Sequence, residues 1–287
     1  MNQPASSRPA LALPFGPLLL LGGVGMGLLL TAGRTLQLMG EMWPLTADLP
    51  GQVRREEVPA TLLDTVNLHL GTQGVTTLLG LLGGGLALSL AFALHRRAAG
   101  HRLTRGPVTV FSWGLRLLTA ALPIVVGAAR LSGRASPLST DSFGILSLVM
   151  PLLLLVPLAC LTWFTLGRLG GWLALTDRFE QTPDNNRHLQ QAFHRVSHPL
   201  LGSAVVTALP LLVLLPVMVI DRAPSISIQL PIQRLLVSQQ EAMLVLTLLT
   251  SLFGTAGLLV MRRLLGHLTH VLDPQHSRMS ALWKTTT

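Results

Sequence analysis

Residues 66–94 read VNLHLGTQGVTTLLGLLGGGLALSLAFAL, a stretch without a single Asp, Glu, Lys or Arg. About 20 apolar residues are enough for an α-helix to cross the roughly 30 Å of hydrocarbon in a bilayer. Because lipid offers no hydrogen-bond partners, the backbone must satisfy its own, and a helix is the expected form. Comparable stretches occur at 11–31, 107–129, 143–167, 199–220 and 240–261. The pattern predicts an all-α, polytopic membrane protein with six transmembrane helices.

The composition fits a chain whose solvent is mostly lipid. Of its 287 residues, 49% are hydrophobic and 11% are charged, and the mean hydropathy is +0.56. A soluble domain carries about 25% charged residues. We predict a first part, 1–65, with one transmembrane helix and a periplasmic loop, and a core of five helices, 66–287, with a cytoplasmic loop at 168–198. The first apolar run exceeds the roughly 7–15 residues of a secretory signal, so we expect an uncleaved helix.

The connection at 95–106 reads HRRAAGHRLTRG and carries four arginines and no acidic residue. Short loops of this kind stay in the cytoplasm. Alternation then places both termini in the cytoplasm, with 13 of the 21 Arg and Lys residues inside, seven outside and Arg116 within a span. The net charge of +9 follows this inside bias. Because no basic stripe is interleaved with aromatic residues, we predict no nucleic-acid partner.

The chain lacks the motifs of nucleotide-dependent and hydrolytic enzymes. A phosphate-binding Walker A loop needs Gly-Lys followed by Ser or Thr, and here the only lysine, Lys284, follows Trp283. No HExxH, Gly-x-Ser-x-Gly or GxGxxG signature is present. We therefore predict no enzymatic activity, no catalytic residue and no cofactor in this chain.

Two histidine pairs at helical spacing, His194 with His198 and His267 with His270, have the geometry of metal ligands. No Cys or carboxylate lies at ligand spacing from either pair, so we predict interfacial histidines and no metal site. The single cysteine, Cys160, lies inside an apolar stretch, where we expect a small core residue rather than a reactive thiol.

Polar groups within or beside the spans are candidates to line a pathway. Arg116 lies about nine residues inside the third apolar stretch, and a charge there is by default a functional hypothesis. A long side chain also reaches the interface by snorkelling, which is the alternative. Asp64, Asn67 and His69 stand at the outer end of the second span. They either line a pore mouth or form a hydrated helix start, and the sequence leaves both interpretations open.

Gly80 and Gly84 stand four residues apart in the second span. Helices in lipid gain little from apolar burial, so small residues that let two backbones approach closely drive their association. This spacing predicts a close helix contact at the two glycines.

The segment 168–198 combines a turn signal, Thr182-Pro183-Asp184, with a polar stretch that follows it. Apolar residues then recur at helical spacing. They are Leu189, Ala192, Phe193 and Val196. We predict a short amphipathic helix whose apolar face is exposed, and which either docks a partner protein or lies on the membrane surface.

Three stretches, at 57–100, 187–205 and 261–275, resemble in their order the permease subunits of binding-protein-dependent peptide/nickel-type ABC importers, in the dipeptide-permease B-like branch. The matching residues are Pro59, Ala60, Thr61, Leu62, His194, Leu200, Leu201, Leu264, Leu265, Leu272, Asp273 and Pro274. The resemblance covers nearly the whole chain, and its specificity lies in the order of the three stretches. Where the family has a glycine in its coupling loop, this chain reads TDRFEQTPDNN at 176–186, a degenerate version.

The resemblance implies an ABC-importer permease-like bundle in a bacterial inner membrane that forms half of a pathway for peptides or similar small solutes. Its partners would be a second permease subunit, two cytoplasmic ABC ATPase subunits that bind ATP and Mg, a periplasmic substrate-binding protein and membrane lipid. The residues implied to couple to the ATPases are Arg178, Phe179, Glu180, Asp184, Leu189, Ala192 and Phe193.

Two other classes of function stay open. A secondary transporter usually shows internal inverted repeats, and none is evident between 1–142 and 143–287. A non-transporting membrane scaffold would tolerate the degenerate loop. The spans carry too few polar groups to choose among peptides, metals and polyamines as substrate.

Overall fold

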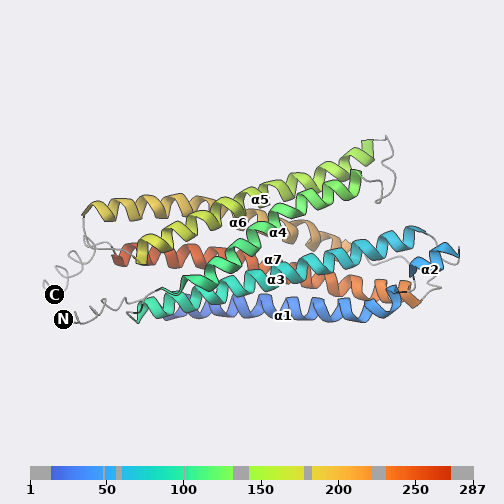
Figure 1. Ribbon diagram of the computed structural model, residues 1–287, viewed down its shortest axis with the longest axis horizontal. Helices are drawn as coiled ribbons and strands as arrows, with labels where there is room; N and C mark the ends of the chain where they lie inside the picture. The colour runs from blue at the N-terminus through green and yellow to red at the C-terminus, as the bar shows by residue number, and fades with distance from the viewer. Residues whose placement is uncertain are drawn as a thin grey trace.

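The computed structural model describes residues 14–47, 49–55, 60–99, 101, 103–131, 142–177, 183–220 and 231–272. These residues form helices and no strand, which confirms the all-α prediction (Figure 1). The helices are α1 (Phe15–Thr46), α2 (Leu49–Arg54), α3 (Ala60–Ala98), α4 (Arg105–Leu131), α5 (Ser142–Asp177), α6 (Pro183–Ile220) and α7 (Pro231–Leu272). Six of them, all except α2 on its own, are long and apolar enough to cross a membrane, as predicted.

The long helices extend well beyond their apolar stretches. At 1.5 Å per residue, the 32, 39 and 42 residues of α1, α3 and α7 give lengths of about 48, 58 and 63 Å, against roughly 30 Å of hydrocarbon. The segment 32–65, expected to be a loop, is therefore mostly helical, because α1 continues to Thr46 and α3 begins at Ala60. Short α2 lies at one end of the bundle, which we call the α2 end, and packs there through Leu49 against Met42 and Leu62.

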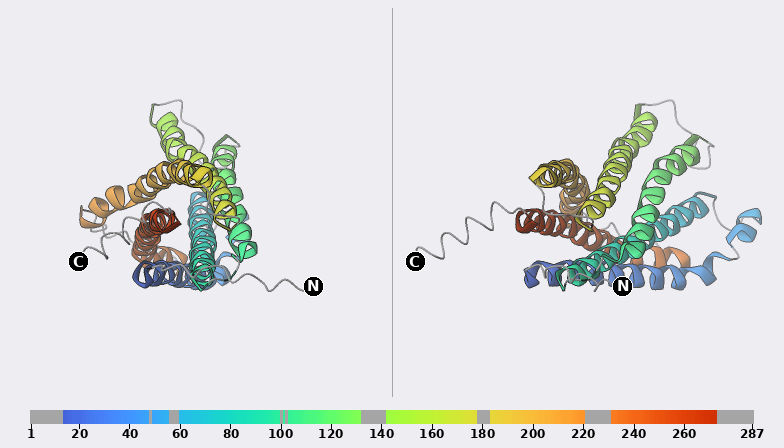
Figure 2. Two further views of the ribbon diagram at one scale, coloured as in Figure 1. Left: turned by 90° about the vertical axis from the view of Figure 1, so that its left-hand side faces the viewer. Right: turned by 60° about the vertical axis from the view of Figure 1, so that its left-hand side comes forward.

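The six long helices form a closed ring. Going round it, each helix contacts the next, in the order α1, α3, α4, α5, α6, α7 and back to α1. Across the ring, α3 and α7 make the one further contact between long helices in the described part of the chain. The views along the bundle show this arrangement (Figure 2, left), and at the α2 end α4 and α5 diverge from α1, α3 and α7 (Figure 1).

A glycine marks every contact in the ring. A methyl group added to Gly84 would lie 2.7 Å from the carbonyl oxygen of Gly25, and one added to Gly80 would lie 2.8 Å from Cβ of Ala32. These distances confirm the predicted close approach at Gly80 and Gly84, with α1 as the partner. The corresponding pairs elsewhere are Gly114 with Leu82, Gly167 with Arg116, Gly202 with Leu161, Gly254 with Thr207, and Gly257 with Val24. Because glycine has no side chain, neighbouring helices can pack closely at these positions. Such close packing drives helix association in lipid, where burial of apolar surface gives little.

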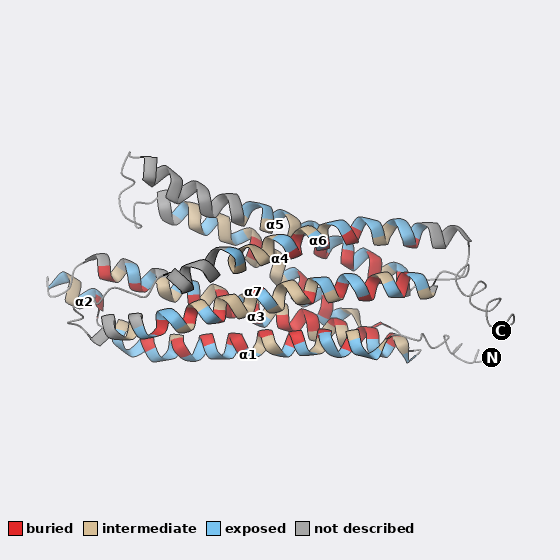
Figure 3. Ribbon diagram, turned by 180° about the vertical axis from the view of Figure 1, so that it is seen from behind, coloured by how far each residue is buried: buried red, intermediate tan, exposed pale blue. Residues whose placement is uncertain are grey.

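The main apolar core occupies the other end of the bundle, where α1 begins and α7 ends, which we call the terminal end (Figure 3). It takes buried side chains from all six long helices, among them Leu21, Leu90, Val108, Leu169, Leu200 and Leu265. Outward-facing positions are apolar as well, with Ile124 and Leu212 each 71% exposed, as expected for surfaces in contact with lipid.

Candidate functional site

The ring surrounds a central, partly open cavity of about 280 Å³. Residues from all six long helices line it, and its position midway along the spans follows from Thr76 in α3, Thr119 in α4 and Thr250 in α7. No charged side chain, amide or histidine is found among the described lining residues. The polar side chains that line it are all hydroxyls: Thr76, Thr119, Thr162, Thr165, Ser203, Thr207, Thr247, Thr250 and Ser251.

Most of these hydroxyl protons are already used by helix backbones. Thr76 donates to the carbonyl of Thr72 at 2.9 Å, Thr119 to that of Leu115 at 2.8 Å, and Thr250 to that of Leu246 at 2.8 Å. Thr207 donates to the carbonyl of Ser203 at 2.7 Å, and Ser251 donates to that of Thr207. A hydroxyl that donates in this way keeps its oxygen lone pairs. The cavity therefore presents hydrogen-bond acceptors on an otherwise apolar wall.

The floor of the cavity is the apolar core of the terminal end. Leu21, Leu86, Leu166 and Met261 belong to both, so the same side chains line the cavity and close it. Beyond them lie Leu169 and Trp172, both 1% exposed. The described residues leave this end of the ring filled by packed side chains.

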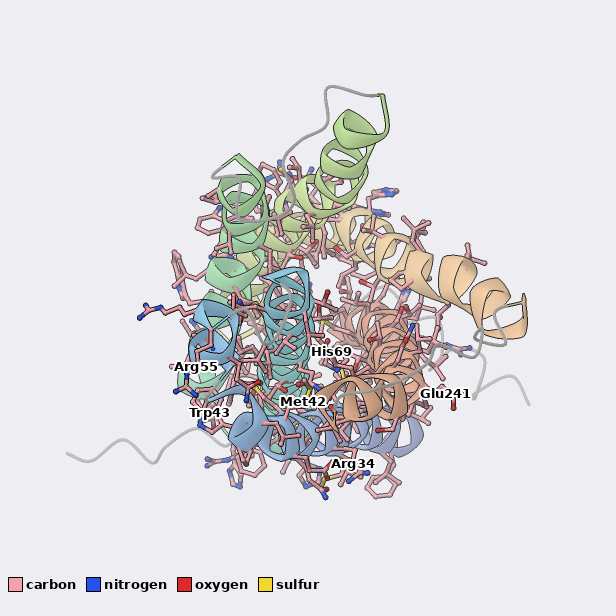
Figure 4. The ribbon with its side chains drawn as sticks, turned by 90° about the vertical axis from the view of Figure 1, so that its right-hand side faces the viewer. Arg34, Met42, Trp43, Arg55, His69 and Glu241 are labelled. Atoms are coloured by element: carbon pink, nitrogen blue, oxygen red, sulfur yellow. The ribbon has the colours of Figure 1, made fainter. Side chains whose placement is uncertain are left out.

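Towards the α2 end, amide groups join α3, α7 and α1. Gln73, fully buried, donates from Nε2 to Oε1 of Gln239 at 3.0 Å and to Nε2 of His69 at 3.2 Å. Gln239 in turn donates to the carbonyl of Leu38 at 3.2 Å and to Oε2 of Glu41 at 3.4 Å. Figure 4 looks onto this end, with His69 between α3 and α7. Both amide nitrogens thus use their two donors, while the buried Oε1 of Gln73 has no hydrogen-bond partner.

The residues predicted to line a pathway do not lie together in the structure. His69 joins this amide network, whereas Asn67 is exposed and the side chain of Asp64 lies outside the described residues. Arg116 lies outside the cavity wall, between α4 and α5. Its guanidinium contacts Gly167 and stacks on Trp113 at 4.9 Å and on Trp163 at 5.3 Å from the ring centroids. Their role in a pathway stays a prediction.

The ATPase-coupling candidates fall into two groups. Arg178, Phe179 and Glu180 lie outside the described residues; Asp184 is in the first turn of α6, and its side chain is not described. The apolar side chains Leu189, Ala192 and Phe193 are found in the bundle core. The expected exposed face is therefore wrong, since Leu189 is 2% exposed and the ring of Phe193 lies against Gly266 of α7. The exposed face of this part of α6 is polar instead, with His188, Gln191, His194 and Arg195.

The four histidines at helical spacing lie on the surface of the bundle. His194, His198, His267 and His270 are all exposed, and the described residues contain no group of three or more potential metal ligands.

The expectation that Cys160 is a core residue is wrong, because it is exposed on the outer surface of α5. An apolar stretch in a span fits lipid-facing and core positions equally, so hydropathy alone could not separate them.

The sequence did not predict two features of the site, the glutamine pair and the set of hydroxyls that line the cavity. Gln73 and Gln239 carried a usable signal, since polar residues inside or at the edge of spans mark functional or structural contacts. The hydroxyl set is scattered over five helices, and only the ring brings it together.

Comparisons with protein-family models, with curated proteins and with solved structures find no match for this chain. The part of the chain that the structure describes is helical, with six helices long and apolar enough to span a membrane, as in a multi-pass membrane protein.

Proposed function

We propose that this chain is the transmembrane subunit of a binding-protein-dependent ABC importer in a bacterial inner membrane. The observation that carries the proposal is the order of three sequence stretches that resemble such permeases. In the structure, 57–100 contains α3, 187–205 lies in α6, and 261–275 includes the last turns of α7. Partner chains would bind and hydrolyse ATP, and this chain would form half of the pathway for peptides or similar small solutes.

The packing of the second and third stretches supports this function. Phe193 of α6 lies against Gly266 of α7, and Arg262 donates from Nε to Oγ of Ser197 at 2.8 Å. The two stretches therefore meet at the terminal end, which the arginine distribution predicts to be cytoplasmic. A force applied to the start of α6 by a moving ATPase would reach α7 directly through these contacts.

The docking surface for an ATPase would be the polar face of α6. His194 and Arg195 are exposed, whereas the apolar residues beside them pack inside the bundle. Arg195 also accepts a hydrogen bond from Arg168 at 2.9 Å, but through its backbone carbonyl, so its side chain is not part of that contact. Charge reversal at these exposed positions would disturb docking without removing core packing.

The test is co-purification from membranes of the source cells. The tagged chain should recover a P-loop ATPase, identified by mass spectrometry. The double substitution His194→Glu with Arg195→Glu should reduce the recovered ATPase at least tenfold. Arg34→Glu, an exposed charge reversal on α1 away from the terminal end, is the matched control and should leave recovery unchanged. Absence of any ATPase, or equal recovery with both variants, would overturn the assignment.

A secondary transporter is the second candidate, and one observation favours it. The cavity is lined by six helices of a single chain, whereas the ABC proposal puts the pathway between two permeases. Uptake of solute by proteoliposomes that contain this chain alone, driven by an ion gradient and unaffected by ATP, would decide for this candidate.

A further inference from the structure

We propose that the central cavity is a binding site for an uncharged, largely apolar molecule that carries a hydrogen-bond donor, such as an alcohol. This inference concerns the cavity alone and does not depend on an ATPase partner. It also differs from the peptides, metals and polyamines that the sequence left open as substrates.

The residues that line the cavity require an uncharged ligand. No Arg, Lys, His, Asp or Glu lines the cavity among the described residues. A charged molecule at mid-membrane depth, without an opposite charge or a full set of hydrogen bonds, is strongly disfavoured. The wall therefore excludes free carboxylates, phosphates and amines, and with them zwitterionic peptides.

The hydrogen-bond donor on the ligand is inferred from the hydroxyl groups of the wall, because most of them already donate their own hydrogen bonds. Thr76, Thr119, Thr207, Thr250 and Ser251 donate to backbone carbonyls and keep lone pairs that can accept. Thr165 and Ser203, both at least 95% buried, face each other across α5 and α6 at 3.1 Å, so one hydroxyl donates to the other and lone pairs remain on both oxygens. A ligand O–H or N–H can donate to these lone pairs, and the five hydroxyls that already donate to backbone carbonyls favour a donor on the ligand over an isolated acceptor.

Size limits the ligand to a small molecule. An apolar protein cavity of about 150 Å³ stays free of water and takes up benzene. The 280 Å³ of this cavity is about twice that volume, which corresponds to roughly ten non-hydrogen atoms. Ligand pockets in proteins usually begin near 300 Å³, so this cavity is at the small end of the range. An eight-carbon alcohol therefore suits both the volume and the chemistry.

The experiment uses the full chain in lipid nanodiscs and a diazirine-bearing octanol as photoreactive probe. Labelled residues are located by mass spectrometry. Labelling of α5, α6 and α7 at lining positions should saturate, and excess 1-octanol should reduce it at least tenfold. Octanoate and octylammonium, of equal chain length but charged, should leave it unchanged. Equal competition by the charged compounds, or labelling confined to lipid-facing residues, would overturn the proposal.

Variants that fill the cavity, compared with a control on the outer surface, distinguish labelling in the cavity from labelling at the lipid-facing surface. Thr162→Phe and Thr247→Phe fill the cavity from half-buried lining positions and should abolish saturable labelling. Val205→Phe adds the same side chain at a position that is 59% exposed on α6 and should label as the unaltered chain does. The double substitution Thr165→Val with Ser203→Ala should weaken competition by octanol about fivefold. Competition by octane, which has no hydroxyl group, should be unchanged. Equal labelling of filled and control variants, or equal effects on octanol and octane, would contradict the site.

Discussion

At the terminal end, side chains from all six long helices meet in one apolar core, whereas at the α2 end amide and carboxylate groups join α1, α3 and α7 while α4 and α5 diverge. The first arrangement fills the ring, and the second ties together only part of it. In an assembly that moves, the terminal end would move as one rigid unit, because its core joins all six long helices. The smaller polar contacts, each worth about 0.6 kcal/mol on average in a membrane protein, would be the ones that exchange.

The largest expected effect is in the apolar core. Leu265, fully buried, belongs to this core, and Leu265→Ala would leave a void among packed side chains. Such truncations cost about 2–5 kcal/mol of unfolding free energy. Scanning fluorimetry of the purified chain should show a clear fall in unfolding temperature. Val205→Ala, at a 59% exposed site, is the control. Similar stability of both variants would show that this core does not stabilise the terminal end.

The next effect is at the α1–α3 contact. Gly84→Ala places a methyl group 2.7 Å from the carbonyl of Gly25, so the two helices must separate, at a cost of about 1–3 kcal/mol. Gly74→Ala lies in the same helix with nothing within 4 Å of the added methyl and should be neutral or slightly stabilising. Chemical unfolding of the two variants side by side measures the difference, and the reverse order would refute this packing.

A smaller effect is expected in the amide network. Gln239→Leu removes the acceptor of Gln73 and the donor to Leu38, so we expect a loss of about 0.5–1.7 kcal/mol. Asn67→Leu, at an exposed position on α3, controls for added apolarity. A double-mutant cycle of Gln73→Leu and Gln239→Leu should show coupling of about 0.6 kcal/mol or more. Strict additivity would mean that the two amides do not interact.

The smallest effect on stability is at Arg116. Its contacts with Trp113 and Trp163 are partly exposed, and such contacts are worth about 0.5–1 kcal/mol each. Arg116→Met keeps much of the side-chain length and loses the cation, so we expect a small change in stability and a shift in tryptophan emission. An unchanged emission spectrum would show that the guanidinium does not contact the two rings.

The sequence predicts the six helices and the Gly80–Gly84 contact because both depend on local properties, apolar length and residue size. It places His69 near the outer end of its span but cannot reveal that its neighbour Gln73 bonds to Gln239, which is 166 positions further along the chain. The apolar face with Leu189 and Phe193 illustrates the main error. Periodicity identifies the face of a helix, and tertiary packing decides whether that face is exposed or covered.

The central claim is that six helices of one chain close into a ring around a cavity, and disulfide formation tests it most directly. In a Cys160→Ser background, the pair Val24→Cys and Gly257→Cys joins α1 to α7 where an added Cβ on Gly257 lies 3.0 Å from Val24 Cγ1. The pair Thr76→Cys and Ser203→Cys faces across the cavity from α3 and α6, which make no contact in the described chain. Under mild oxidation the first pair should cross-link within one chain and the second should not. Efficient cross-linking of the second pair, or none of the first, would contradict the ring.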